Sequence, residues 1–541
     1  MLRRTTRLAL TLAALFCAAA CGSDDGPERR PAQTRVLVVG WDGATWDLID
    51  PLLAEGRMPN LARMLERGSQ AVLESTIVPI SSAAWVGAVT GRDPGHSGVY
   101  GFFEPVPDTY DVTLISARSV EAPPIWRTLS RRGGRSLVVG VPVTWPPEPI
   151  EGVLVSGMLA PKDSVWTWPP ALTERLRARG YAPDLGIWRD ANEISGEILE
   201  RQLAAKRELL LELMANEDWD LAFFVFKELD VVSHFAYDGR TDTFVAALYE
   251  ALDRELGALL AAVGPGVRVL VVSDHGFHAY PTSFFPWRWL VDEGFSVERA
   301  PVAEPADLES LPLAQRRSLE NASAMDALDL GRTRAFAGLA EGNFGGVRLN
   351  LAGREPEGSL APDQAEATLV ELERRLAELR VPGTDRPLVV RTWRREELYP
   401  GPFVDLVPDL MFETDPEVAV RPVPHDARFE AHEPRFPDHR RDGILIAAGP
   451  GLAAVAERGR ASILDVGPTA LHLMGHAVYR ELEGRVLTDL LTTPDPVRTL
   501  DASQEAPRPS EQRWLEDASW NDPQLDEVRQ RLKATGYAEA R

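Results

Sequence analysis

The apolar residues of this chain recur in two patterns that alternate along it. Short apolar runs at residues 35–40, 136–141, 153–156, 221–226, 267–272 and 443–448 predict buried strands. Segments with apolar residues at helical spacing stand between several of them, at residues 58–67, 197–216 and 243–263. This alternation predicts an α/β fold, in which helices sandwich a doubly wound, mostly parallel sheet.

The regular pattern is interrupted between residues 295 and 428. Pro- and Glu-rich loops fill much of this stretch, and only residues 363–379 have the spacing of a helix. We interpret residues 295–428 as an inserted or accessory region in a discontinuous core formed by residues 34–294 and 429–490. Within the second part of the core, Asp465 is the expected N-cap of a helix that runs to Met474.

The two ends of the chain have the composition of segments outside a core. Three arginines precede an apolar run at residues 8–20 that is too short to span a bilayer, so residues 1–20 are predicted to be a secretory signal peptide. Residues 21–33 have the composition of a solvated tether. Residues 491–541 are rich in Pro, Asp, Glu and Ser and are expected to form a tail with a short helix at 524–535.

The residues around Cys21 predict where the exported chain resides. The sequence Ala-Ala-Ala-Cys-Gly at the end of the apolar run resembles a bacterial lipoprotein cleavage site, although Ala18 replaces the usual Leu. We therefore expect a periplasmic or cell-envelope lipoprotein that is anchored to a membrane through Cys21. Cleavage by an ordinary signal peptidase at the small residues is the alternative.

Charge and cysteine content exclude several classes of function. The formal net charge of −23 makes the surface repel polyanions, so no nucleic acid polymer is expected as a partner. A phosphate-ester substrate would need bound cations. Both cysteines, Cys17 and Cys21, lie in the leader region, so the mature chain has no internal disulfide, no cysteine nucleophile and no cysteine-derived formylglycine of the sulfatase type.

Three predicted strands are each followed by an aspartate. Asp42, Asp230 and Asp274 stand there, with His234 four residues after Asp230 and His275 directly after Asp274. Any one of these acids alone would be an ordinary loop or N-cap residue. Because ligands bind beyond the carboxyl ends of parallel strands, their combination with histidines predicts a site for zinc or another divalent first-row metal.

His439 is a further candidate ligand. It lies in the sequence Pro-Asp-His-Arg-Arg-Asp-Gly, just before the strand predicted at residues 443–448. The remaining histidines are expected in loops, on the surface or beside the site, and His472 is expected to pack in an apolar helix. These residues are His96, His278, His425, His432, His472 and His476.

Ser81 is the candidate nucleophile. It precedes an Ala-rich run with helical character, so a helix N-cap is an alternative role that is compatible with the first. Coordination to a divalent metal lowers the pKa of a hydroxyl and makes it nucleophilic. The chain contains neither a Gly-x-Ser-x-Gly elbow nor a Walker A loop, so metal-assisted attack is the coherent mechanism.

These motifs resemble the type I phosphodiesterase and nucleotide pyrophosphatase branch of the alkaline phosphatase superfamily. The resemblance covers residues 34–490 and includes residues 40–47, 90–98, 350–356 and 465–469, as well as the interval from Ser81 to Gly91. Many relatives have Thr followed by Pro or Phe and then Pro at the nucleophile. Here the sequence is Ser81-Ser82-Ala83, so Ser82 is a minor alternative to Ser81.

The resemblance implies an alkaline phosphatase-like fold with two divalent metals, commonly zinc, with manganese as the other possibility. One metal site is expected to contain Asp42, Ser81, Asp274 and His275, and the other Asp230, His234 and His439. Ser81 is then expected to attack phosphorus in line and to form a phosphoseryl intermediate, which water hydrolyses.

The expected function is that of an exported metal-dependent hydrolase of phosphodiester or pyrophosphate bonds. A phosphomonoesterase or phosphonate hydrolase of the same superfamily is the alternative. A catalytically silent surface lipoprotein that binds a ligand is the alternative from another class. The accessory region at residues 295–428 is expected to shape substrate choice, because discrimination must come from contacts outside the metal core. The sequence leaves the oligomeric state open.

Overall fold

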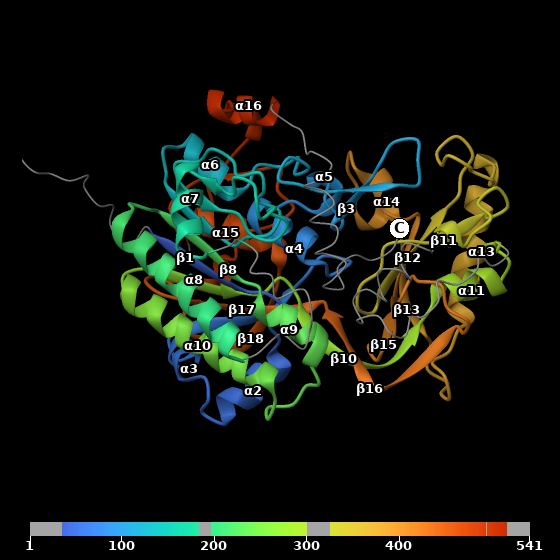
Figure 1. The fold of residues 1–541 in the computed structure, drawn as a ribbon, viewed down its shortest axis with the longest axis horizontal. Coiled ribbons are helices and arrows are strands. Elements are labelled where there is room, and N and C mark those ends of the chain that lie inside the picture. Colours follow the sequence, from blue (N-terminus) through green and yellow to red (C-terminus); the bar gives the residue numbers. More distant parts are fainter. Residues whose placement is uncertain (1–34, 182, 184–195, 300–324, 494, 517–541) are drawn as a thin grey trace, which may run out of the picture.

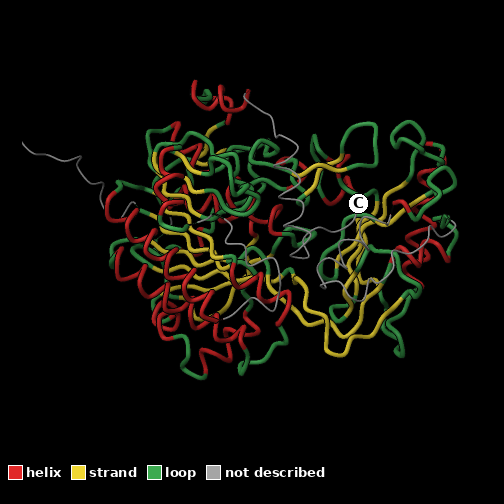
Figure 2. The backbone as a smooth tube through the Cα atoms, viewed as in Figure 1, coloured by secondary structure: helices red, strands yellow, loops and turns green. Residues whose placement is uncertain are grey.

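A nine-stranded sheet forms the centre of the larger lobe, which we call the core lobe (Figures 1 and 2). The computed structural model describes residues 35–181, 183, 196–299, 325–493 and 495–516. The strand order is β18-β2-β17-β9-β1-β8-β5-β6-β7. Its five parallel central strands are β9 (Arg268–Val272), β1 (Val36–Trp41), β8 (Leu221–Phe226), β5 (Ser136–Val139) and β6 (Gly152–Val155). The predicted α/β fold with a mostly parallel sheet is confirmed.

Both faces of this sheet are covered, which explains why its central strands are apolar throughout. Along β1, Leu37 and Val39 belong to one buried cluster, and Val36 and Val38 belong to another on the opposite face. The helices α2 (Trp46–Ala54), α3 (Pro59–Leu65), α8 (Gly196–Asn216) and α10 (Phe244–Val263) pack on the first face. The helices α4 (Ser81–Thr90), α6 (Ile125–Arg131) and α15 (Val466–Leu473) pack on the second.

Two strands near the margins of the sheet, β17 and β7, run antiparallel to the centre. β17 (Asp442–Ala448) runs antiparallel between β9 and β2 (Gly68–Glu74), and β18 (Val455–Ser462) pairs with β2 at the edge. At the other edge, β7 (Thr167–Trp168) is antiparallel to β6. β2 and β18 lack the continuous apolar runs of the central strands, because β2 alternates between buried and half-buried residues and β18 is largely exposed.

The second lobe, which we call the accessory lobe, contains a separate four-stranded antiparallel sheet in the order β11-β12-β14-β13 (Figure 1, right). These strands are β11 (Ala335–Ala337), β12 (Phe344–Leu349), β14 (Leu410–Thr414) and β13 (Val389–Arg394). The helix expected at residues 363–379 is α13 (Ala365–Glu378), which helps to form the lobe's own buried cluster. All five elements lie within the predicted accessory region. Its Pro- and Glu-rich loops at 304–317 are outside the described residues.

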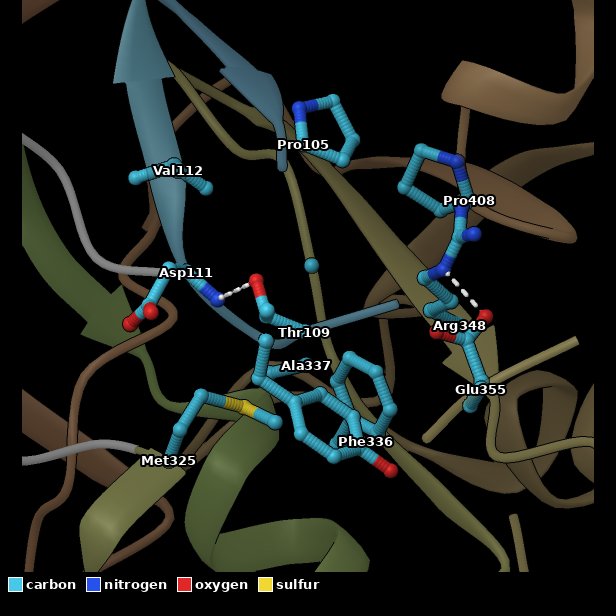
Figure 3. Close-up of a pocket in the computed structure, with 12 residues that line it drawn as sticks. Pro105, Thr109, Asp111, Val112, Met325, Phe336, Ala337, Arg348, Glu355 and Pro408 are labelled. Carbon is cyan, nitrogen blue, oxygen red and sulfur yellow. Dashed lines mark hydrogen bonds and ion pairs between the residues drawn. The ribbon is translucent and has the colours of Figure 1, made fainter. Parts of the chain in front are cut away.

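Two ribbons connect the lobes. The antiparallel pair β10 (Gly276–Phe284) and β16 (Phe429–Arg440) runs between them along the lower side of Figure 1, and the short β15 (Val418–Val420) pairs with β10. On the upper side, the hairpin of β3 (Phe103–Pro105) and β4 (Val112–Leu114) reaches the accessory lobe, where Tyr110 donates a hydrogen bond of 2.7 Å to Asn350 Oδ1. Figure 3 shows the cavity at this junction, lined by Thr109, Phe336 and Arg348 among others. Its volume of about 50 Å³ indicates close packing of the hairpin on the lobe.

The C-terminal segment packs on the core lobe as far as it is described. β20 (Thr499–Leu500) pairs with β19 (Val478–Tyr479), and α16 (Pro509–Glu516) is held by an ion pair between Arg131 Nε and Glu511 Oε2 at 3.1 Å. The segment predicted as a C-terminal tail is therefore packed on the core lobe as far as residue 516. The helix expected at 524–535, the signal peptide and the tether lie outside the described residues. Among the residues that are described, no helix has both the length and the apolar character needed to cross a membrane.

Candidate active site

The three aspartates predicted at strand ends lie at one edge of the sheet. In the register of the sheet, Trp41 is paired with Phe226 and Gly40 with Val272. Asp42 follows β1 directly, Asp274 follows β9 by two residues, and Asp230 lies in α9 (Glu228–Ala236), which begins just after β8. The parallel pairing of these strands therefore brings together acids that are far apart in the sequence, since Asp42 and Asp274 are separated by 232 residues.

Asp230, His234 and His439 form the first group. Asp230 and His234 are four residues apart on α9, and His234 Nε2 lies 3.6 Å from Asp230 Oδ1. His439 enters from β16, with its Nε2 atom 3.2 Å from Asp230 Oδ1 and 3.0 Å from His234 Nε2. One ligand atom from each residue thus lies within 4.8 Å of the other two, which is a geometry that can hold a metal ion.

Asp42, Ser81, Asp274 and His275 form the second group. His275 Nε2 lies 3.1 Å from Ser81 Oγ, 3.2 Å from Asp274 Oδ2 and 3.7 Å from Asp42 Oδ1. The opposite oxygens of the two carboxylates are fixed, because Trp85 Nε1 donates to Asp42 Oδ2 at 2.9 Å and the Gly43 amide donates to Asp274 Oδ1 at 3.3 Å.

The two groups are adjacent. The rings of His275 and His439 stack with centroids 3.7 Å apart, and Asp230 Oδ1 lies 3.9 Å from His275 Nε2. The structure therefore brings all seven predicted site residues into one cluster, with Asp230 near both groups.

Ser81 is the first residue of α4, and the N-cap position belongs to Ile80. The alternative role of Ser81 as the N-cap is therefore wrong, although its hydroxyl does lie at the N-terminus of a ten-residue helix. Ser82 is also fully buried, but its Oγ atom has no hydrogen-bond partner among the described residues. Ser81, and not Ser82, is the serine whose hydroxyl contacts His275.

Backbone carbonyls orient both central histidines. His439 Nδ1 lies 2.8 Å from Pro79 O, and His275 Nδ1 lies 3.2 Å from Gly276 O. Because a carbonyl oxygen only accepts, each Nδ1 carries a proton, and Nε2 is the ring atom that faces the centre of the cluster. Each histidine is therefore oriented so that Nε2 is the atom that can bind a metal.

Burial sets the electrostatics of the cluster. Asp42, Asp230, Asp274, His275 and His439 are all completely inaccessible to solvent. Burial, together with repulsion from Asp274 and Asp230, raises the pKa of Asp42 well above its usual range. Burial and repulsion from Asp230 raise the pKa of Asp274 to about 7, and burial lowers the pKa of His275 well below its usual range. Each shift shows that the charged form of the residue is costly in the metal-free protein.

The residues present fit divalent cations. The buried atoms Asp42 Oδ1 and Asp230 Oδ2 have no hydrogen-bond partner among the described residues, so each can ligate a cation without losing another contact. Carboxylate, imidazole and hydroxyl ligands together suit zinc, and manganese is also compatible with them. Three carboxylates in a buried site would also be stabilised by the charge of such ions.

Comparison with known proteins identifies the family. Residues 36–435 match the model of the family described as type I phosphodiesterase / nucleotide pyrophosphatase. The chain belongs to this family. Type I phosphodiesterases and nucleotide pyrophosphatases are metal-dependent phosphoryl hydrolases, so the predicted family and the coarse class of activity are confirmed.

Solved structures similar to this member of the type I phosphodiesterase / nucleotide pyrophosphatase family support the fold. Phosphonoacetate hydrolase from Sinorhizobium meliloti 1021 is 17% identical with a TM-score of 0.55, and the match covers 82% of this chain and 96% of that one. Murine ectonucleotide pyrophosphatase / phosphodiesterase 5 is 15% identical with a TM-score of 0.50, covering 85% and 100%. No functionally curated protein sequence has a significant match to the chain.

Glu341 is a residue of the site that the sequence did not predict. It is buried and comes from the accessory lobe, in the turn between β11 and β12, and its Oε1 atom lies 3.5 Å from His439 Nδ1. Next to it, Gly342 has a φ of +58°, and a Cβ atom there would lie 2.2 Å from the carbonyl oxygen of His439. Close backbone contact therefore requires glycine at position 342 and holds Glu341 against the histidine. The only local signal in the sequence is a Gly-Asn turn, which says nothing about this distant contact.

The other histidines lie outside the cluster. His96 contacts Asp93 and Glu483 in a partly exposed group, and His472 is buried in α15 as expected. His278, His425 and His432 lie near the β10–β16 ribbon.

Proposed function

We propose that this protein is an exported phosphodiesterase or nucleotide pyrophosphatase-type hydrolase in which Ser81 is the nucleophile. The observation that carries the proposal is the position of Ser81 Oγ, buried 3.1 Å from His275 Nε2 beside three completely buried aspartates, of which Asp42, Asp230 and Asp274 each keep one oxygen without a hydrogen bond among the described residues. A buried serine has no structural need for such neighbours, whereas metal-assisted attack on phosphorus requires them.

The cluster would hold two divalent metal ions, zinc or manganese. Asp42, Ser81, Asp274 and His275 would hold one, and Asp230, His234 and His439 would hold the other. When bound, the metals supply positive charge that lowers the pKa of the serine hydroxyl and stabilises the charge on the phosphoryl oxygens and the leaving group.

Ser81 is placed for in-line displacement at phosphorus. In the first step the Ser81 hydroxyl loses its proton to solvent, its oxygen forms a bond to phosphorus, the bond to the leaving oxygen breaks, and the leaving group departs with the electron pair. In the second step water forms a bond to phosphorus, the bond from phosphorus to Ser81 Oγ breaks, and a proton returns to Oγ, so that the serine is regenerated and a phosphomonoester is released. The N-terminus of α4 faces this position and favours the anionic phosphoryl group in both steps.

The supporting residues keep the ligands in place. Trp85 orients Asp42 by donating a hydrogen bond to it. The carbonyl oxygen of Pro79, which is two residues before the nucleophile, accepts a hydrogen bond from His439 and orients its ring. Glu341 adds a negative charge beside the protonated Nδ1 of His439, which increases the basicity of Nε2 as a ligand. The segment from Pro79 to Trp85 therefore carries the nucleophile and also orients two of the ligands, Asp42 and His439.

The cellular location remains part of this proposal. The three arginines and the apolar run at residues 8–20 support export, and the residues around Cys21 support a lipid anchor in the cell envelope. The substrate would be a phosphate ester outside the cytoplasm, and the acidic composition argues against a nucleic acid polymer.

Phosphonate hydrolysis and phosphomonoester hydrolysis are the alternatives for the same site. Phosphonoacetate hydrolase is among the structures that share the fold, and the metal cluster alone does not distinguish these substrates. A catalytically silent binding protein is less compatible with the structure, because the nucleophile and all six other predicted ligands are present and converge.

The test is hydrolysis of bis-p-nitrophenyl phosphate, p-nitrophenyl phosphate and a phenyl phosphonate monoester by the purified protein with added zinc or manganese. The variant Ser81→Ala should lose turnover of every ester, and Ser82→Ala should retain it. The relative rates on the three esters rank the substrate classes. Absence of metal-dependent turnover on all three would refute the proposed function.

A further inference from the structure

A large pocket opens beside the site, where the two lobes meet. Its volume is about 800 Å³, within the range of pockets that bind small organic ligands. His234 forms part of its wall, so the pocket is continuous with the first metal-ligand group. The remaining wall comes from the end of α9, from β10 and the adjoining Phe285, and from the segment 421–437, which includes most of β16.

Several aromatic rings contribute to this wall, among them the partly exposed rings of His425 and Phe436 and the buried ring of Phe285. The ring of His425 stacks on that of Phe285, with centroids 3.8 Å apart and an angle of 9° between the planes. The guanidinium of Arg421 lies 5.5 Å from the centroid of Phe285 and 5.1 Å from that of Phe436. The rings that line the pocket are those of Phe235, Tyr237, Phe285, His425, His432 and Phe436, besides His234.

The charges on the wall nearly balance. Arg421 and Arg435 stand against the three acids Asp238, Glu430 and Glu433, which gives a net charge of −1 with neutral histidines. Arg421 and Arg435 also each have a carboxylate within 4.0 Å. Such a wall does not attract a polyanion, but it offers planar surfaces and scattered polar atoms to an uncharged ring.

We propose that this pocket binds an uncharged, planar aromatic group attached through an ester oxygen to the phosphorus atom. The inference rests on the proposed function, because that function places the phosphoryl group at the cluster that includes His234. With phosphorus there, the organic substituent enters the pocket between α9 and the segment 421–437. The partly exposed rings of His425 and Phe436 are the contacts that select an aromatic group over an alkyl one.

The pocket gives the β10–β16 ribbon that connects the two lobes a specific part in selection. The segment 421–437 continues directly from β15 of this connection and ends two residues before His439. One stretch of chain therefore contributes both the wall of the pocket and a ligand of the metal cluster.

The proposal can be tested by measuring ligand binding to a variant that does not turn the ligand over. Zinc-loaded Ser81→Ala protein is titrated by calorimetry with 1-naphthyl phosphate and with methyl phosphate, which share the phosphoryl group and differ in the substituent. We expect 1-naphthyl phosphate to bind at least about tenfold more tightly. Adding His425→Ala or Phe436→Ala should each reduce that preference by about three- to tenfold, because one aromatic contact is removed. The affinity for methyl phosphate should stay the same.

Phe244→Ala provides the matched control, since Phe244 is an exposed aromatic residue on α10 outside the pocket. It should change neither affinity. Equal affinity for the two esters, or a preference that both pocket substitutions leave intact, would overturn the proposal. Failure of the proposed function would look different. In that case the wild-type protein would hydrolyse no ester, but the preference for the aromatic ester would persist and would still depend on His425 and Phe436. The pocket would then bind an aromatic group, and the proposed activity would be refuted.

Discussion

The buried Asp274 should make the metal-free protein lose stability as the pH rises. The pKa of this carboxyl is raised from 3.8 to about 7 by burial and by repulsion from Asp230. A carboxyl with a raised pKa in the folded state binds its proton more tightly there than in the unfolded chain. Its contribution to stability is therefore fully present below about pH 4 and is lost as the pH rises through 7.

The size of the effect follows from the shift. A difference of about three pKa units corresponds to about 4 kcal/mol in the free energy of unfolding. Unfolding entropies of about 2 cal/mol/K per residue give a chain of 541 residues an unfolding entropy of about 1 kcal/mol/K. The melting temperature of the metal-free protein should accordingly fall by about 4 °C between about pH 3.5 and 8 because of Asp274 alone.

The assay is differential scanning fluorimetry in EDTA across this pH range, on the wild type and on Asp274→Asn. The variant cannot titrate at this position, so its melting temperature should fall by about 4 °C less than that of the wild type. Asp385→Asn, which changes an exposed aspartate of the accessory lobe, is the control and should match the wild type. Added zinc should abolish the wild-type decline, because bound metal favours the ionised carboxylates. Identical pH profiles for Asp274→Asn and the wild type in EDTA would refute the reasoning.

Three further predictions concern the nucleophile and the contact between the lobes. Ser81→Ala should lower kcat by about 10³-fold or more while the protein retains bound zinc in elemental analysis, whereas Ser82→Ala should stay within a few-fold of the wild type. Glu341→Gln should weaken zinc binding by about 10- to 100-fold in competition with a chelator, because His439 loses the neighbouring negative charge, and unchanged affinity would assign Glu341 a packing role only. Gly342→Ala should destabilise the protein in urea by at least about 1–2 kcal/mol, since alanine disfavours a φ of +58° and its Cβ would contact His439 O at 2.2 Å.

The central strands could be predicted from sequence because they are buried on both faces. β1 and β8 are apolar from end to end, and among the described elements of comparable length they alone have such a run. β18 could not be predicted in this way, since its edge position leaves Glu457, Arg458 and Arg460 in a strand held mainly by backbone pairing to β2. β16 could not be predicted from the sequence either, because it contains Pro434 and Pro437, and proline is uncommon within strands.

The candidate site was predictable where its residues follow a strand. Asp42 and Asp274 were found because parallel strands end at a common edge, and His439 because it precedes an apolar strand by a few residues. Glu341 could not be found, since its contact with His439 depends on how a separate lobe packs against the core. Neither the periodicity of apolar residues nor the spacing of motifs indicates that Glu341 lies next to His439.

The antiparallel strand β17 has a consequence for the order in which the molecule can be assembled. It separates β9 from β2, and it begins only three residues after His439. During synthesis, β2 is made early but cannot join the growing sheet until residues 442–448 have emerged to bridge it. The same event delivers His439 to Asp230 and His234. A nascent or truncated chain that ends before residue 439 lacks both the strand that joins β2 to β9 and a ligand of the cluster, so the joining of β2 to the sheet and the assembly of the candidate metal site depend on the same segment of chain.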